Sequence, residues 1–545
     1  MGTSLKLVDI IILVAFIAFM VIYALRHRKT SSSKDYFLAG KTMSWPVVGL
    51  ALFAASVSSS TLVGHAGEAF ISGVAVFNYN WISVLVMVVV ATFFLPFYLK
   101  TGIFTIPEYL GRRFDGRSRT YFSFITILGN VFLDAAACLY TGALVIKMIF
   151  PELSTMWIIV GMALIAGSYT ILGGLSSVIK ADMVQAVVLI VGSIILSTVV
   201  VHKIGGWEQI VARFHDGVWL KLTRSLDDPT VPWLGMIVGI PILGFYFWGN
   251  NQVMVQRVLS AKSVDHGRKG VLFVGFLYMF TLFIIILPGL VGRGLDMFGV
   301  HLPDEIIKGS DLRSVWHVDT NSVYPTLIMK YMPVGLIGIV LAAMISALTA
   351  ALSATLNSVS TLFTMDFYAK WTKNKEGKHL VRVGQITAFI VLIIAVLWAP
   401  FIAKFDSLVA YYQEIVSYLA PPIVGTFFLG LFWKRSNAQG AFSGLMAGFV
   451  IGALIMALKY IVHVKISIHF LLLAPVLLII SALVNIIVSK ATTPPPAEKV
   501  LPNTWTRQYW IDETKELKGV PWYKNFRVLA LLLIVACFVE YFFFF

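Results

Sequence analysis

Long apolar runs separated by short polar segments recur along the whole sequence. Each run is close to the ~20 residues that an α-helix needs to cross the hydrocarbon of a bilayer. The fourteen apolar windows fall at about 5–25, 46–66, 79–99, 119–149, 155–174, 180–204, 233–255, 271–293, 334–365, 383–404, 408–432, 441–461, 467–489 and 527–544. The pattern predicts an all-α polytopic membrane protein with about 14 transmembrane helices.

Two of these windows are interrupted by residues that do not suit a lipid-facing helix. In the first, a cluster of hydroxyl side chains is followed by small and ionisable residues: Ser56, Ser58, Ser59, Ser60, Thr61, Gly64, His65, Gly67 and Glu68. The second, 233–255, carries four glycines and a proline before Asn250, Asn251 and Gln252. Broken helices survive at membrane depth where they face protein or a water-filled cavity, and in transporters that cavity binds the solute. The alternative is that the glycines only allow close helix packing.

Composition and charge support membrane insertion and indicate an orientation. The chain is 58% hydrophobic and only 13% charged, far from the composition of a soluble domain. Of its 42 Lys and Arg residues, 29 fall in loops after odd-numbered windows, which the positive-inside rule assigns to the cytoplasm. We therefore expect a multi-pass protein of the cell (plasma or inner) membrane with both termini external. The net charge of +15 needs no nucleic-acid partner, and the two cysteines, Cys138 and Cys537, indicate neither a disulfide nor a metal site.

Several motifs, in order along nearly the whole chain, carry a family resemblance. They are Phe37-Leu-Ala-Gly-Lys41, the Ala54–Gly67 segment, Gly173-Gly174-Leu175 with Asp182 and Gln185, Trp248-Gly249-x-Asn251-Gln252-x3-Gln256-Arg257, Leu356-Asn357-Ser358, Phe363-Thr364-Met365-Asp366 and Leu429-Gly-Leu-Phe-Trp-Lys434. The chain resembles the sodium:solute symporter family, most closely its sodium/glucose and sodium/galactose branch. The resemblance implies the leucine-transporter fold, with two inverted five-helix repeats and flanking helices.

The same resemblance divides the chain into segments. A first helix and loop (1–45) precede the first repeat (46–204), and an external loop (205–232) leads to the second repeat (233–432). Two flanking helices (433–489), a cytoplasmic linker (490–526) and a last helix (527–545) follow. Pro494, Pro495 and Pro496 predict that the start of this linker is stiff.

The resemblance also implies a solute site. Where galactose-transporting members have polar or charged sugar contacts, this chain has Asn80 for a glutamate, Gly244 for an asparagine and Tyr278 for a lysine. The expected solute residues are Ser56, Thr61, His65, Tyr79, Asn80, Ser83, Phe247, Trp248, Tyr278 and Gln413. Phe247 and Trp248 would form the inner gate, and His65 and Tyr79 would lie near the outer lid. The loss of both charged contacts predicts a small neutral polar solute such as a sugar or polyol.

The cation site implied by the resemblance is incomplete. Carbonyl oxygens near Ala54, Val57 and Ala347 would bind sodium, but the two expected hydroxyl positions are Ala350 and Ala351. Sodium is a hard cation that needs several oxygen ligands, so their loss should weaken the site. The hydroxyls of Ser346 and Thr355, four residues away, are displaced by roughly 6 Å along the helix.

Two aspartates are candidates for the cation path or for coupling. Asp134 stands within an apolar window, where a carboxylate is costly and therefore suggests function, either with sodium or as a proton carrier. The alternative is that Asp134 pairs with a basic or amide group in the bundle. The family resemblance implies that Asp182 lies on the inward exit path of the cation. His65 could titrate near neutrality, although a lone histidine at a helix break is more often a hydrogen-bonded structural residue.

These observations favour a cation-coupled secondary symporter, with sodium as the coupling ion and no other cofactor. A proton-coupled or uncoupled transporter, or a solute sensor of the same fold, is the alternative. An enzyme is disfavoured because the sequence has no metal-ligand spacing, phosphate-binding loop or nucleophile elbow. A channel would need a polar lining through several helices rather than two local breaks. The expected partners are the solute and the lipid bilayer, with the oligomeric state left open.

Overall fold

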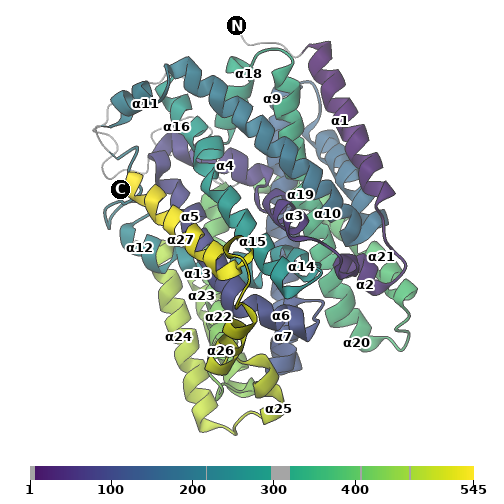
Figure 1. The fold of residues 1–545 in the computed structure, drawn as a ribbon. Coiled ribbons are helices and arrows are strands. Elements are labelled where there is room, and N and C mark those ends of the chain that lie inside the picture. Colours follow the sequence, from purple (N-terminus) through teal and green to yellow (C-terminus); the bar gives the residue numbers. More distant parts are fainter. Residues whose placement is uncertain (1–5, 216–217, 296–319, 405–407, 465–467, 545) are drawn as a thin grey trace.

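The chain folds into helices in a computed structural model that describes residues 6–215, 218–295, 320–404, 408–464 and 468–544 (Figure 1). Within these residues the only β-type pairing is an isolated bridge between Met43 and Ala261. Eleven helical stretches in the described residues are long and apolar enough to cross a membrane, or twelve when one bent pair is counted as a span. The prediction of an all-α membrane protein is therefore confirmed, and the number of crossings stays a prediction.

The helices follow the predicted windows closely, with short helices between them. In the first half they are α1 (Leu7–Arg26), α2 (Ser33–Leu38), α3 (Trp45–Ser56), α4 (Ser59–Ser72), α5 (Asn78–Val89), α6 (Leu95–Thr101), α7 (Ile106–Arg113), α8 (Gly116–Gly129), α9 (Ala136–Ile149), α10 (Thr155–Ile204) and α11 (Trp207–Phe214). The second half contains α12 (Trp233–Val238), α13 (Ile240–Phe245), α14 (Gln252–Leu259), α15 (Val264–Met279), α16 (Leu287–Gly294), α18 (Val323–Tyr331), α19 (Leu336–Leu362), α20 (Ala369–Trp371), α21 (Gly377–Trp398) and α22 (Leu408–Phe432). The last part contains α23 (Ala438–Tyr460), α24 (Phe470–Ala491), α25 (Ala497–Val500), α26 (Arg507–Glu516) and α27 (Phe526–Phe543).

Helix α10 joins two predicted windows and has one non-helical residue. Its 50 residues would extend about 75 Å if straight, more than twice the ~30 Å of a hydrocarbon core. At Gly174 the backbone takes φ 64° and ψ −168°, a conformation that glycine adopts without steric cost. A Cβ atom at this position would also lie 2.6 Å from the ring of Tyr36. Only glycine therefore permits this break in α10.

The first predicted helix break is confirmed and lies between α3 and α4. Val57 (φ −93°, ψ 78°) and Ser58 (φ −78°, ψ 170°) leave helical geometry, and the Ser58 hydroxyl then caps α4 by accepting from the Thr61 N–H at 3.2 Å. Helix α4 runs without a break through Gly64 and Gly67, and both positions are buried in the bundle. Gly67 instead permits close packing, since a Cβ there would lie 2.4 Å from the Thr320 carbonyl oxygen.

The second predicted break is also confirmed and lies between α13 and α14. A π-helical turn over Tyr246–Asn250 follows α13, and Asn251 then becomes extended (φ −71°, ψ 124°). The Asn251 side chain accepts from the Val253 N–H at 2.8 Å, so it caps the start of α14. Insertions of this kind are frequent at functional sites.

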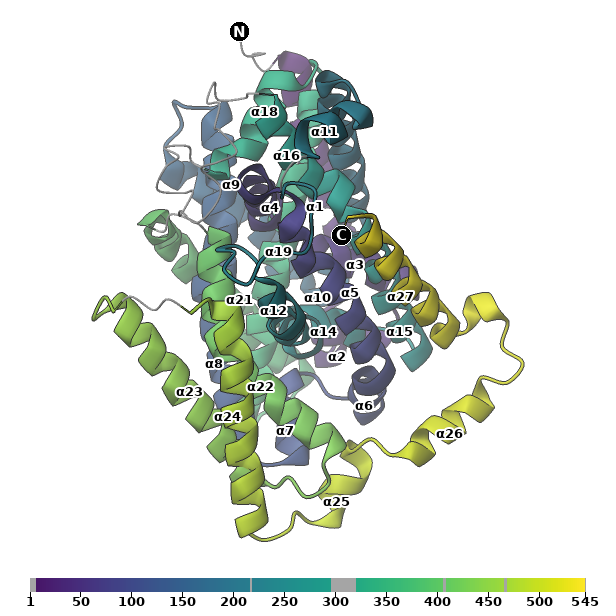
Figure 2. The ribbon, with the colours of Figure 1, turned by 90° about the vertical axis from the view of Figure 1, so that its left-hand side faces the viewer.

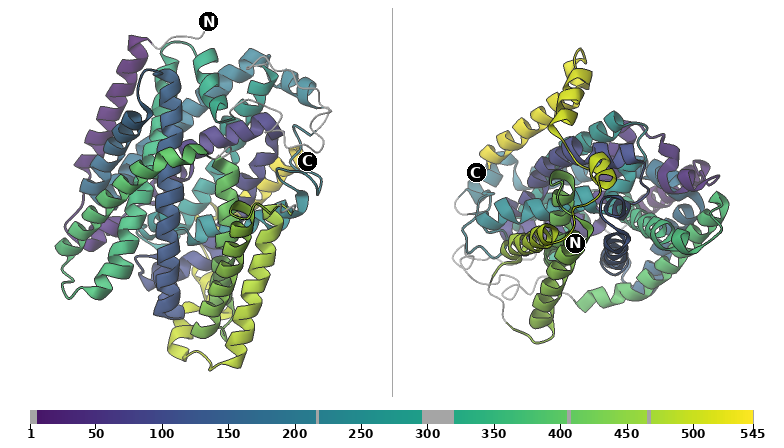
Figure 3. Two further views of the ribbon diagram at one scale, coloured as in Figure 1. Left: turned by 180° about the vertical axis from the view of Figure 1, so that it is seen from behind. Right: turned by 90° about the horizontal axis from the view of Figure 1, so that it is seen from below.

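The packing places both broken segments inside the bundle. Helix α19 packs along α10, α1 and α3, while α15 lies along α3 and α5. Helices α22, α23 and α24 pack against one another at one flank, where α23 and α24 extend side by side (Figure 2). The predicted linker is partly helical: α25 and α26 cross one end of the molecule and lead to α27 (Figure 3).

Candidate functional site

A cavity lies where the two broken segments face one another. Its volume is about 180 Å³, more than ten times the 10–15 Å³ that one water molecule needs. All ten residues predicted to bind the solute line this cavity: Ser56, Thr61, His65, Tyr79, Asn80, Ser83, Phe247, Trp248, Tyr278 and Gln413. The structure thus brings them together from α3, α4, α5, the π-helical turn after α13, α15 and α22.

Aromatic rings form one wall of the cavity. The ring of Trp248 packs edge-to-face against Phe247 on one side and Tyr278 on the other, with 5.2 Å between ring centroids in both pairs. Tyr278 also packs edge-to-face against Phe53 of α3. These contacts hold flat apolar faces against the cavity, and such faces suit the C–H surface of a cyclic solute.

Polar groups that line the cavity are held in fixed positions. The Ser83 hydroxyl donates to the Tyr79 carbonyl at 2.6 Å, and the Asn80 amide donates to the Thr281 hydroxyl at 2.8 Å. Gly244 leaves the Ser83 hydroxyl accessible, since a Cβ there would lie 3.2 Å from it. The Gln413 side chain makes no hydrogen bond within the described part of the chain, so both ends of its amide are available to a solute.

His65 projects into the cavity from α4 and is buried, with 7% of its surface exposed. Its Nδ1 has no hydrogen-bond partner among the described residues. The side chain therefore lacks the local hydrogen bond at Nδ1 that a purely structural histidine would be expected to make. Its position near an outer lid stays a prediction.

Asp134 lies in a π-helical turn, Asn130–Ala135, and lines the same cavity. The side chains of Tyr412 and Tyr246 are its close polar neighbours. It forms no ion pair with any described residue, so the proposed pairing with a basic group is not found there. Sequence reasoning identified Asp134 but missed both tyrosines, although Tyr412 directly precedes the predicted Gln413.

The residues of the predicted cation site lie beside the first break. Helix α3 ends at Ser56, so the Ala54 carbonyl lacks the N–H partner that a continuing helix would supply. Across from them, Ala347, Ala350 and Ala351 lie buried on α19, and Ala351 reaches the cavity wall. Backbone oxygens suited to a hard cation are present, but the methyl groups of Ala350 and Ala351 supply no oxygen. The residues therefore fit a sodium site of the family's form only in part.

The hydroxyl groups nearest to those alanines are engaged with their own helix. Ser346 donates to the Ala342 carbonyl at 2.7 Å, and Thr355 donates to the Ala351 carbonyl at 3.0 Å. Thr355 also lines the cavity.

Asp182 makes a fully buried ion pair that the sequence did not reveal. Its Oδ2 accepts from Arg257 Nη2 at 2.7 Å and from Nε at 3.0 Å. Its Oδ1 and the nearby Gln185 Oε1 have no hydrogen-bond partner among the described residues. Gln185 donates to the Thr349 hydroxyl at 2.8 Å on α19. Arg257 belongs to the motif that begins at Trp248, but only the fold shows that it contacts Asp182.

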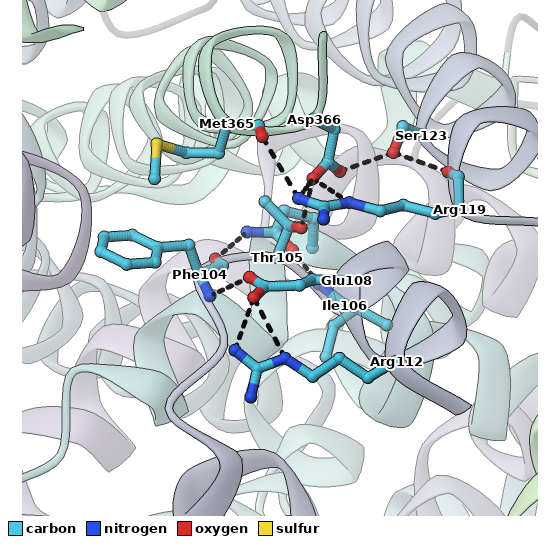
Figure 4. Close-up of polar contacts among 10 residues, drawn as sticks. Phe104, Thr105, Ile106, Glu108, Arg112, Arg119, Ser123, Met365 and Asp366 are labelled. Carbon is cyan, nitrogen blue, oxygen red and sulfur yellow. Dashed lines mark hydrogen bonds and ion pairs between the residues drawn. The ribbon is translucent and has the colours of Figure 1, made fainter. Parts of the chain in front are cut away.

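Other motif residues form a densely bonded polar network. Asp366 accepts from Thr105 at 2.8 Å, from Ser123 at 2.5 Å and from Arg119 Nε at 2.9 Å (Figure 4). The Gln256 amide donates to Phe37, Asn357 and Thr361. We call Asp182, Gln256, Arg257, Asp366 and their partners the paired polar network.

A cavity between two broken helices inside a bundle of membrane-length helices defines the molecule as a secondary transporter in architecture. The sequence pattern of the sodium:solute symporter family matches residues 36–448. The chain is 34% identical to the mouse sodium/myo-inositol cotransporter over 95% of its own length and 77% of that protein. It is 32% identical to rabbit sodium/glucose cotransporter 1, over 89% of the chain and 79% of that protein. The chain belongs to the sodium:solute symporter family.

Solved structures agree with this fold. A substrate-bound, outward-open sodium-coupled sialic acid symporter superimposes with a TM-score of 0.78 and 21% identity, covering 90% of this chain and 99% of that one. A nucleobase-cation symporter with a bound hydantoin gives a TM-score of 0.54 at 11% identity, covering 87% and 98% of the two chains. Both likenesses concern the fold alone.

Proposed function

We propose that the protein is a cation-coupled symporter that moves a small neutral polar solute, a sugar or a polyol, by alternating access. The observation that carries this proposal is the chemistry of the cavity. Its lining contains no Lys, Arg or Glu, and Asp134 is the one carboxylate among the described lining residues. Aromatic faces together with hydroxyl and amide groups suit a ring that bears several hydroxyls. The inositol and glucose cotransporters among the relatives support the same solute class.

Sodium is the coupling ion that we favour. Family membership and the Ala54 carbonyl near the end of α3 support it, and the oxygens of Asp182 and Gln185 that lack a partner among the described residues offer further acceptors along α10. The second candidate is proton coupling through Asp134, which is favoured by its place on the cavity wall without a basic partner among the described residues.

We further propose two inverted five-helix repeats, at 46–204 and 233–432, each containing one of the two breaks. The basic loops follow α1, α6, α20, α22 and α24, at the end of the molecule opposite the N-terminus (Figure 1). The positive-inside rule makes this end cytoplasmic and the N-terminus external. The C-terminus, after α27, is then external too, in a cell membrane.

Uptake into proteoliposomes tests the function and the coupling ion together. The purified protein would be supplied with labelled myo-inositol, glucose, galactose and a neutral amino acid, under an inward sodium gradient or an inward proton gradient. We expect accumulation of one sugar or polyol above equilibrium under the sodium gradient. Accumulation that needs the proton gradient and is lost in Asp134→Asn would support the second candidate instead. If none of the sugars or polyols enters under either gradient, the proposed solute class is wrong.

A further inference from the structure

A second cavity, of about 380 Å³, lies outside the solute site at the end of α1. The end of α1 with the residues that follow it, the start of α3 with the residues before it, and the α10 segment after Gly174 form its walls. Four cationic side chains line it: Arg26, Arg28, Lys29 and Lys180. Ser44 and Ser176 add hydroxyl donors. Two segments about 150 positions apart therefore bring positive charge to one hollow.

Among the described residues, no carboxylate lines this cavity to balance its charge. The described residues that line the cavity include no Asp or Glu, and none of the four cations takes part in an ion pair among the described residues. Like charges gathered in one hollow repel one another, so an anion that enters it would gain attraction from several cations at once. Arginine and lysine with hydroxyl donors are the side chains that bind phosphate oxygens.

The depth of the cavity in the membrane identifies the source of such an anion. Helix α1 has 20 residues, so its apolar length is about 30 Å, the thickness of the hydrocarbon core. Arg26, its last residue, therefore lies at the level of the lipid headgroups. Val14, Phe19 and Ile22 leave more than half of their surface exposed along the same helix. A lipid with its headgroup in the cavity would have this apolar face for its acyl chains.

We propose that this cavity binds a phosphate-bearing anion, supplied by the headgroup of an anionic phospholipid in the cytoplasmic leaflet. Basic pockets between membrane helices on the cytoplasmic side have this chemistry. A bound headgroup would join the end of α1 to the α10 segment just after Gly174, beside the start of α3. The inference depends on the orientation of the chain and not on which solute or coupling ion it uses.

Lipid binding to the purified full-length protein in detergent tests the proposal. Native mass spectrometry would compare the affinity for the first bound phosphatidylglycerol with that for phosphatidylcholine of the same acyl chains. The test variant is Lys29→Gln/Lys180→Gln. The matched control is Lys373→Gln/Lys375→Gln, which removes the same charge from an exposed loop at the same end of the molecule. A third protein, Lys29→Gln, changes one exposed side chain and should fold normally.

We expect phosphatidylglycerol to bind more tightly than phosphatidylcholine. The test variant should weaken phosphatidylglycerol binding about thirtyfold and Lys29→Gln about fivefold, while the control changes it less than about twofold. Equal effects of the two double variants, or equal binding of both lipids to the wild type, would overturn the proposal.

Inorganic phosphate and glycerol 1-phosphate distinguish the two sources of the anion. We expect neither to bind at millimolar concentration, because they lack acyl chains for the α1 face. If glycerol 1-phosphate bound to the wild type and not to the test variant, and phosphatidylglycerol did not bind, the cavity would still be a phosphate site. The proposal that its ligand is a lipid would be overturned.

Discussion

The solute cavity and the paired polar network are both rich in polar side chains, but these side chains differ in how many hydrogen-bond partners they have within the protein. Asp366 accepts from three side chains, and Arg257 holds Asp182 through two donors. In the cavity, the half-buried Gln413 makes no hydrogen bond to another described residue, and His65 Nδ1 has no partner among them either. Buried polar groups normally find partners within the fold. A group that lacks one beside a cavity is therefore available to a ligand.

This difference separates two kinds of motif residue that look alike in the sequence. Gln256 and Gln413 are both amides within apolar surroundings. Gln256 connects Phe37, Asn357 and Thr361 and so joins α14 to α19, whereas Gln413 faces the cavity. We expect substitutions in the network to reduce stability first, and substitutions in the cavity to reduce solute binding first.

The largest expected effect is on stability, from Arg257→Ala. This change would leave the Asp182 carboxylate buried without its partner, and breaking a buried pair typically costs about 3–5 kcal/mol. The melting temperature in detergent should fall steeply, whether or not solute is present. Arg257→Lys keeps the charge but loses the paired donors, so its melting temperature should lie between those of the wild type and Arg257→Ala. A wild-type melting temperature for Arg257→Ala would mean that the network does not stabilise the fold.

Much of the architecture could be predicted from the sequence, because it follows from local patterns. The hydroxyl cluster at Ser56–Thr61 and the glycines before Asn251 predict the two breaks, since neither segment suits a continuous lipid-facing helix. The resemblance then placed ten residues around one solute, and all ten line one cavity. Whether they bind the solute is a question for the uptake experiments.

The pairings that hold the fold together could not be predicted, because they join distant positions. Asp182 and Arg257 are 75 residues apart. Asp9 lies near the start of α1, yet it accepts from the N–H groups of Gly335 and Gly338, at 2.8 Å each, where α19 begins. An anion at a helix N-terminus is stabilising, but no local pattern shows which helix it meets. The π-helical turn that carries Asp134 has no simple sequence signal either.

The second-largest expected effect is a loss of solute affinity in Gln413→Ala and Ser83→Ala. Each leaves a solute hydroxyl without its partner, which costs about 1–3 kcal/mol, or roughly fivefold to 150-fold in affinity. Uptake measured over a range of solute concentrations should show this loss, while the melting temperature stays near that of the wild type. Gln508→Ala, on the exposed helix α26, is the matched control and should leave uptake unchanged. Wild-type uptake by both cavity variants would remove these residues from the proposed site.

A smaller effect is expected from the double variant Ala350→Ser/Ala351→Ser. It would return two hydroxyl oxygens to the positions where the family's cation site has them. If sodium binds there, its half-saturating concentration should fall by about fivefold, equivalent to about 1 kcal/mol. Ala354→Ser adds a hydroxyl to the same buried face of α19 outside the site and serves as the control. An unchanged sodium dependence would count against a cation between α3 and α19.

The smallest effect is expected from Arg112→Gln, which removes an exposed ion pair near the network. Arg112 pairs with Glu108 one helical turn away (Figure 4), but its side chain is 41% exposed. Water competes for both charges, and exposed pairs of this spacing contribute only about 0.3–0.5 kcal/mol. The melting temperature should therefore change little, far less than in Arg257→Ala. If Arg112→Gln lowered the melting temperature as much as Arg257→Ala, burial would not decide which ion pairs stabilise the fold. Buried and exposed ion pairs would then contribute equally to stability.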